Sequence, residues 1–215
     1  ITLKSLAKKY NDLVILADLS LGIERNSKHA LIGQSGSGKS TVLKVLVGLI
    51  EKDAGIAYIN GKDIHTRSKE IRSITGYMSQ NIDLDNELSV IDNLIISARL
   101  HGLDYKTAKR NSIHYLDHLN SLELLKMSPK DLSYGQKRKI MFIRSILHNP
   151  EVLILDEPTK GLDPHSRDGI WDIIDKFIPK KTVLFSTQNL EEAEKYADRI
   201  AILHEGNIKM DGTLE

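Results

Sequence analysis

The stretch GQSGSGKS at residues 33–40 constrains the fold more than any other part of the sequence. It fits the pattern G-x-x-x-x-G-K-[ST] at every fixed position. The apolar run before it, 29–33, predicts a short buried strand, and the run that starts at Lys39 predicts a helix. Its glycines let the backbone turn so that successive N–H groups face inward and bind an anion. The order strand, loop and helix therefore predicts an α/β fold with a phosphate-binding loop.

A pair of acids supplies the second chemical feature. The run VLILDEP at 152–158 ends a predicted buried strand with Asp156 and Glu157. Unpaired buried carboxylates are costly, and a cation and a water molecule would relieve that cost. Beside such a loop, we expect Lys39 to reach the β- and γ-phosphates and Ser40 and Asp156 to hold Mg²⁺. Glu157 is suited to polarise an attacking water as a general base. The alternative is that the two acids simply begin a loop.

The remaining pattern predicts a core interrupted by helices. Residues 2–10 and 13–23 read as paired strands, and 55–64 reads as a hairpin around an Asn-Gly turn. From about 83 to 149 the periodicity becomes helical, and strands alternate with helices after that. We therefore expect one α/β domain over 1–215 that carries a helical subdomain at about 83–149.

Charge, histidine and cysteine content give little support to nucleic-acid, metal or disulfide sites. The net charge of +1 gives no bulk electrostatic reason to bind nucleic acid directly. The basic run 137–139 is interpreted as a helix surface near a partner or the phosphates. His114 and His118 have the spacing of metal ligands on a helix, but no third ligand is evident, so a solvated helix face is expected. The absence of cysteine fits a reducing compartment.

A longer stretch makes a family resemblance visible. Residues 132–164, LSYGQKRKIMFIRSILHNPEVLILDEPTKGLDP, resemble the nucleotide-binding domain of ATP-binding cassette (ABC) transporters, and the likeness runs the length of the chain. It implies a P-loop NTPase with a RecA-like core, an N-terminal antiparallel β subdomain and a helical subdomain. Residues 87–103 look most like the exporter subfamily that includes daunorubicin-resistance and sodium-extrusion ATPases.

The resemblance also implies roles for individual residues. The adenine-stacking aromatic and the Walker A loop correspond to Tyr10, Gly33, Gln34, Ser35, Gly36, Ser37, Gly38, Lys39, Ser40 and Thr41. The catalytic positions correspond to Glu157, Gln80 of the Q-loop and Gln188 at the switch position, and the metal contacts to Ser40, Gln80 and Asp156. The signature and D-loop, which family members present to ATP held by a partner cassette, correspond to Leu132, Ser133, Tyr134, Gly135, Gln136 and Asp163.

Three positions depart from the family pattern. Tyr134 stands where glycine is usual, and Lys160 stands where a small residue is usual. Gln188 stands where the family has its switch histidine. A glutamine amide can hydrogen-bond phosphate or water, but it cannot carry a proton near neutral pH as histidine can. We therefore expect slower or more weakly coupled hydrolysis at the site that uses this chain's own Walker A loop. Tyr134 and Lys160 would affect the opposite site, in which this chain serves its partner. Departures at both sites suggest an asymmetric pair of cassettes. The alternative is that Gln188 is a neutral replacement.

The resemblance implies an ATPase that uses ATP and Mg²⁺ and dimerises with an identical or different cassette. It implies a membrane-embedded permease as partner, export as the direction, and a peripheral position on the cytoplasmic face of a membrane. The chain starts at Ile1, so we expect it to be part of a longer chain or complex. Two alternatives remain open: an ABC ATPase that acts on ribosomes or nucleic acid, and a regulatory cassette that does not hydrolyse ATP. The 52 residues between Gln80 and Ser133 leave no room for the long coiled coil of repair ATPases.

Overall fold

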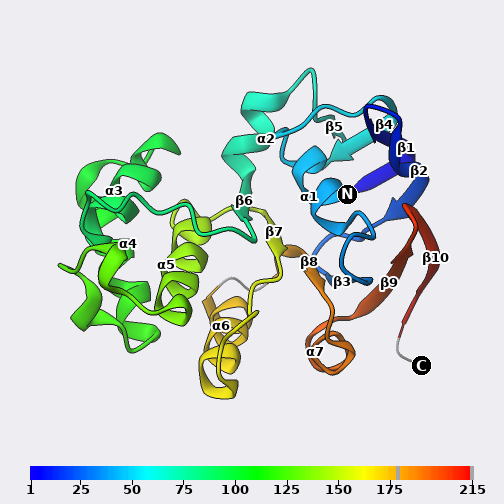
Figure 1. The fold of residues 1–215 in the computed structure, drawn as a ribbon. Coiled ribbons are helices and arrows are strands. Elements are labelled where there is room, and N and C mark those ends of the chain that lie inside the picture. The colour runs from blue at the N-terminus through cyan, green and yellow to red at the C-terminus, as the bar shows by residue number, and fades with distance from the viewer. Residues whose placement is uncertain (178–179, 214–215) are drawn as a thin grey trace. The chain divides into compact units, whose positions relative to one another are not determined.

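A computed structural model describes residues 1–177 and 180–213 of the 215-residue chain. These residues form two compact units, each assembled from segments that are distant in sequence (Figure 1). The first unit contains Ile1–Tyr77, Glu151–Glu157 and Lys180–Glu215, and the second contains Met78–Pro150 and Pro158–Pro179.

The main sheet of the chain has six strands in the order β10-β9-β3-β8-β7-β6. The strands are β3 (Lys28–Ile32), β6 (Thr75–Met78), β7 (Val152–Asp156), β8 (Thr182–Thr187), β9 (Arg199–His204) and β10 (Asn207–Gly212). The strands β9, β3, β8 and β7 run parallel to one another, while β10 pairs antiparallel with β9. Every residue of β7 and β8 is buried, which explains why these strands read as continuous apolar runs.

A second, antiparallel sheet follows from the N-terminal strands. It has the order β2-β1-β4-β5, with β1 (Thr2–Tyr10), β2 (Leu13–Gly22), β4 (Ala54–Ile59) and β5 (Lys62–Asp63). Asn11 and Asn60 lie at the two hairpin turns with φ of 52° and 51°, a conformation that asparagine tolerates well. Both hairpins were predicted from the sequence, and the predicted fold class is confirmed.

Helix α1 (Lys39–Leu46) packs between the two sheets of the first unit and completes its core. Its residues Val42, Leu43 and Leu46 are fully buried with Leu16 and Leu19 of β2. The unit also contains α7 (Leu190–Tyr196) and α2 (Ser68–Ile74), of which α2 was not predicted. Only Ile71 of α2 is buried, so this helix lacks the repeated apolar face that would have revealed it.

The second unit is helical (Figure 1). It contains α3 (Val90–Leu100), α4 (Tyr105–His118), α5 (Tyr134–Ile146) and α6 (Pro164–Phe177), with short 3₁₀ turns at Leu122–Leu124 and Pro129–Asp131. Ser89 and Asp104 cap α3 and α4 by accepting hydrogen bonds from the backbone N–H groups of Asp92 and Thr107.

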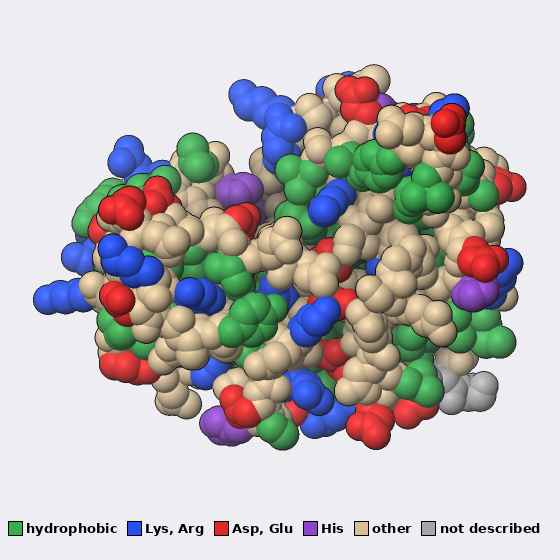
Figure 2. Space-filling model, viewed as in Figure 1, with side chains coloured by type: hydrophobic (Ala, Val, Ile, Leu, Met, Phe, Trp, Pro, Cys, Tyr) green, Lys and Arg blue, Asp and Glu red, His purple; other side chains and the backbone are tan. Residues whose placement is uncertain are grey.

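Along the described parts of the chain, no helix combines the length and the apolar character needed to cross a bilayer. On the face shown in Figure 2, basic and acidic side chains are interspersed. This mixture of charges agrees with the small net charge of the chain.

Candidate functional site

Three neighbouring strand ends bring the predicted chemistry of the first unit together. Ile32 of β3 lies opposite Thr187 of β8, and Asp156 of β7 lies opposite Ser186 of β8. Because these strands are parallel, the residues that directly follow them lie at the same edge of the sheet. These residues are the phosphate-binding loop, Glu157 and Gln188. In open α/β sheets this carboxyl edge is where ligands bind.

The loop at 33–40 has the backbone geometry that its glycines suggested. Gly36 and Gly38 have φ of 83° and 106°, which favours glycine at both positions. A Cβ atom at Gly38 would lie 2.9 Å from Leu16 Cδ2, and one at Gly33 would lie 2.4 Å from the carbonyl oxygen of Leu203. Gly38 is also the N-cap of α1 and provides no side chain to the first-turn N–H groups. The N-terminus of a helix is a place where anions bind.

Lys39 lies against the loop that precedes it. Its side chain is buried, and its ammonium donates to the carbonyl oxygens of Gly33 at 2.6 Å and Gln34 at 2.9 Å. Ser40 and Thr41 follow in the first turn of α1 and are half-buried. The charge is therefore held at the mouth of the loop by backbone carbonyls.

Ser186 connects the two acids at the end of β7. Its hydroxyl donates to Asp156 Oδ1 at 2.6 Å and accepts from the backbone N–H of Glu157 at 3.0 Å. Asp156 is only 1% exposed, so its carboxylate is fixed in a site with little water. The sequence analysis did not single out Ser186. Its position within a buried apolar run, directly before two polar residues, was the available signal.

Glu157 contacts the residue at the switch position. Gln188 Nε2 donates to Glu157 Oε1 at 2.7 Å, and Glu157 is 7% exposed. Glu157 has a φ of 48°, a left-handed conformation that turns the chain sharply after β7. The amide of Gln188 therefore occupies one oxygen of the acid that was predicted to act as the general base.

Tyr10, the predicted adenine-stacking residue, ends β1 in the same unit and is 47% exposed. Lys8 Nζ lies 5.4 Å from the centroid of its ring, within the range of a cation–π contact. An exposed aromatic ring at this position is free to stack on a planar group, so the role assigned to Tyr10 stays a prediction.

The predicted signature lies in the second unit, at the start of α5. The Ser133 hydroxyl accepts from the backbone N–H of Gln136, and the Gln136 side chain accepts from the backbone N–H of Ser133, which makes a capping box. Leu132 is buried just before the cap. Tyr134, which stands where the family usually has glycine, is 46% exposed.

The two departures Tyr134 and Lys160 lie near the same loop. Gly161, directly after Lys160, has a φ of 74°, and a Cβ atom there would lie 2.8 Å from Cε1 of Tyr134. A Cβ atom at Gly135 would likewise lie 3.4 Å from Cδ2 of Leu162. The tyrosine ring therefore packs on the predicted D-loop, where the usual glycine would leave a gap.

Asp163 caps α6. Its Oδ1 accepts from the backbone N–H of Ser166 at 3.0 Å. The hydrogen bonds from Ser166 hold the pKa of the Asp163 carboxyl below its usual range, because they favour the charged form. The carboxylate that was predicted to serve a partner cassette therefore favours its charged form and also caps the start of α6.

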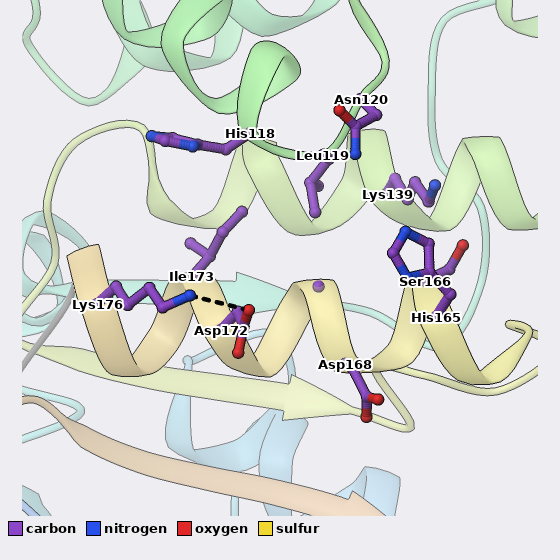
Figure 3. Close-up of a pocket in the computed structure, with 11 residues that line it drawn as sticks. His118, Leu119, Asn120, Lys139, His165, Ser166, Asp168, Asp172, Ile173 and Lys176 are labelled. Carbon is purple, nitrogen blue, oxygen red and sulfur yellow. Dashed lines mark hydrogen bonds and ion pairs between the residues drawn. The ribbon is translucent and has the colours of Figure 1, made fainter.

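A cavity of about 310 Å³ lies in the second unit between α6 and the end of α4 (Figure 3). Lys139 and His165 point toward each other at one end, and Lys176 pairs with Asp172 at 3.1 Å at the other. His118 borders the cavity and is exposed, as is His114. Among the described residues no group of three His, Cys, Asp or Glu side chains could hold a metal ion.

One interpretation of the basic run 137–139 was wrong. Arg138 is fully buried, whereas a helix surface was expected. Its Nη1 donates to the backbone carbonyl oxygens of Ser79 and Gln80, at 2.8 and 3.0 Å. Backbone acceptors from a distant segment hold the guanidinium, and no local pattern in the sequence indicates them.

Comparison with known proteins agrees with this geometry. A family model described as "ABC transporter" matches residues 16–160. The daunorubicin resistance ATP-binding protein DrrA3 of Streptomyces coeruleorubidus is 34% identical over all of this chain and 68% of its own length. The Nod factor export ATP-binding protein I of Burkholderia orbicola is 32% identical over 99% of this chain and 70% of its own length.

Solved structures give the same result. An ATP-binding subunit of an ABC transporter superposes with a TM-score of 0.90 at 32% identity, covering 99% of this chain and 89% of its own. A dimeric cassette in a post-hydrolysis state with ADP and Pi superposes with a TM-score of 0.89 at 22% identity, covering 100% of this chain and 98% of its own, and supports the fold. With the phosphate-binding loop and two acids at one sheet edge, these matches show that the chain belongs to the ABC transporter family, as an ATP-binding cassette and an ATPase.

Proposed function

We propose that this cassette hydrolyses ATP to drive export through a membrane-embedded permease, to whose cytoplasmic side it binds. The observation that carries this proposal is the convergence of the phosphate-binding loop, Asp156 and Glu157 on one edge of the sheet. The names of the daunorubicin-resistance and Nod factor export relatives support export as the direction. The match of the whole chain to such subunits also supports a single domain over 1–215 that works within a larger assembly.

We assign nucleotide binding to Tyr10 and to residues 33–41. In this assignment the loop N–H groups and the first turn of α1 hold the phosphates, and the Lys39 ammonium exchanges its carbonyl partners for phosphate oxygens. The Ser40 hydroxyl and the buried Asp156 carboxylate are oxygen ligands of the kind that Mg²⁺ prefers. When bound, Mg²⁺ supplies positive charge beside the β- and γ-phosphates.

Glu157 is the proposed general base. It orients a water molecule for in-line attack on the γ-phosphate and accepts its proton. The Gln188 amide, at 2.7 Å, holds one carboxylate oxygen in place. Gln80 would contact Mg²⁺ and the attacking water. The signature, including Ser133 and Gly135, and Asp163 of the D-loop would face ATP on a second cassette, identical or different.

The test of the proposed function is purification of the full-length protein from solubilised membranes. We expect a multi-spanning membrane protein to copurify in fixed ratio, and we expect ATP hydrolysis that nuclease treatment leaves unchanged. Activity that fractionates with ribosomes or nucleic acid would contradict the proposal in favour of a translation- or DNA-linked ATPase. ATP binding without turnover would identify a regulatory cassette instead.

The replacement Gln188→His tests the effect of the switch position. We expect single-turnover hydrolysis to rise about fivefold, the equivalent of one ordinary hydrogen bond of about 1 kcal/mol in the transition state. An imidazole can contact the γ-phosphate and carry a proton, which the amide cannot. Gln188→Asn, which shortens the amide by one methylene, serves as control and should not exceed the wild-type rate. Equal rates for wild type and Gln188→His would make Gln188 a neutral replacement.

A further inference from the structure

Ser186 stands among apolar residues in an inner strand of the first unit. β8 pairs with β3 on one side and with β7 on the other, and Ser186 lies opposite Leu31 and Asp156 of these strands. Its side chain is fully buried, as is that of its neighbour Phe185. Burying a hydroxyl among apolar groups is costly unless it forms hydrogen bonds. The partners of Ser186 must therefore account for a serine at this position.

The two hydrogen bonds of Ser186 determine where its hydroxyl proton points. A hydroxyl has one O–H to donate and two lone pairs that accept. The backbone N–H of Glu157 can only donate, so the hydroxyl accepts there, at 3.0 Å. Its proton then points to Oδ1 of Asp156 at 2.6 Å, the length of a charge-assisted hydrogen bond. One oxygen atom thus joins the side chain of the proposed Mg²⁺ ligand to the backbone of the proposed general base.

The bond to Glu157 supports a turn that few residues adopt unaided. Glu157 has a φ of 48°, in the left-handed region that non-glycine residues occupy only where their surroundings hold them. The bond is buried, and without it the N–H of Glu157 would lose this acceptor in a place with little water. Ser186 therefore helps to fix the point from which the Glu157 side chain leaves the main chain.

The bond to Asp156 orients the second acid. A side chain that hydrogen-bonds a metal ligand holds the ligand in one orientation, and its loss typically costs about 10–100-fold in metal affinity or activity. Asp156 is buried and belongs to β7, so the sheet already fixes its backbone. The side chain is the part of Asp156 that Ser186 can orient.

We propose that Ser186 is a positioning residue that fixes Asp156 and Glu157 relative to each other. It touches no reacting atom and acts through the two acids, one by its side chain and the other by its backbone. The inference rests on the proposed function, because it takes the two acids as the Mg²⁺ ligand and the general base of one site. The competing explanation is that the hydroxyl only stabilises the end of the strand.

The test compares Ser186→Ala and Ser186→Thr with wild type in the full-length protein. Ser186→Ala removes only the hydroxyl, whereas Ser186→Thr keeps it. The matched control is Thr182→Val, because Thr182 is buried at the other end of β8 and its hydroxyl also accepts from a backbone N–H, that of Asn26 at 3.1 Å. In single-turnover hydrolysis we expect Ser186→Ala to be at least about tenfold slower, with a Kd for Mg²⁺-free ATP within about twofold of wild type. Ser186→Thr should recover part of the rate, and Thr182→Val should match wild type.

Two further measurements do not depend on turnover. Mn²⁺ serves as a spectroscopic substitute for Mg²⁺, and its affinity is measured by electron paramagnetic resonance with a non-hydrolysable ATP analogue. This affinity should be about tenfold weaker in Ser186→Ala than in wild type or Thr182→Val. Amide hydrogen exchange at residues 155–157, measured without nucleotide, should be faster in Ser186→Ala and unchanged in Thr182→Val.

A folded Ser186→Ala protein with wild-type Mn²⁺ affinity and wild-type exchange would overturn the inference, whatever its rate of hydrolysis. Equal losses in Ser186→Ala and Thr182→Val, in step with their Tm values, would also overturn it, because they would show a role in stability only. If wild type itself shows no Mg²⁺-dependent hydrolysis, the proposed function fails instead, and the exchange at 155–157 still decides whether Ser186 holds the turn.

Discussion

Replacing Glu157 with glutamine is expected to lower the rate of ATP hydrolysis by about 10²–10⁴-fold, the usual contribution of a general base. Glutamine has the shape of glutamate, and its carbonyl oxygen can still accept the hydrogen bond that Gln188 Nε2 donates at 2.7 Å. The left-handed turn at residue 157 and the hydrogen bond between its N–H and Ser186 involve the backbone and are kept. The substitution therefore removes the proton acceptor while preserving its surroundings.

The measurement is single-turnover hydrolysis, together with equilibrium binding of ATP. Binding should change by less than about threefold, because Glu157 is assigned to the attacking water and not to the phosphates. Glu191→Gln is the matched control, since Glu191 is an exposed acid on α7 of the same unit. A rate within about threefold of wild type for Glu157→Gln would show that another group activates the water.

Much of the first unit could be predicted because local patterns determine it. The continuous apolar run of β7 indicated a buried strand, and glycines indicated the loop before α1. The loop motif also identified Lys39 as a candidate site residue, and the pair of acids at the end of β7 identified Glu157. The sheet topology then placed both at one edge, as expected for ends of neighbouring parallel strands.

The contacts that a distant segment provides could not be predicted. Ser186 bridges Asp156 and Glu157 across 30 and 29 residues of sequence, and Arg138 meets Ser79 and Gln80 across 59 and 58. The apolar run around Ser186 indicates a buried position but not which residues the hydroxyl meets. An arginine in a basic run has the same local signature whether it is buried or exposed. Tyr134 is similar, because only the fold shows that its ring packs on Gly161.

Replacing Lys39 with alanine is expected to weaken ATP binding and to remove most hydrolysis. The ammonium is buried and lies at the loop through its bonds to Gly33 and Gln34, so its charge acts where the phosphates would bind. Hydrogen bonds that involve charged groups contribute about 1.5–3 kcal/mol each, which corresponds to roughly a 10- to 150-fold change in Kd. Alanine favours a helix, so α1 should remain folded.

Lys44→Ala is the matched control, because Lys44 lies on the same helix in its last turn. This variant should bind and hydrolyse ATP as the wild type does. The most direct test of a triphosphate site at this sheet edge is therefore the Kd for ATP of Lys39→Ala, measured at equilibrium beside Lys44→Ala and wild type. The account predicts at least a tenfold weaker Kd for Lys39→Ala alone. Equal affinity in all three proteins would contradict it.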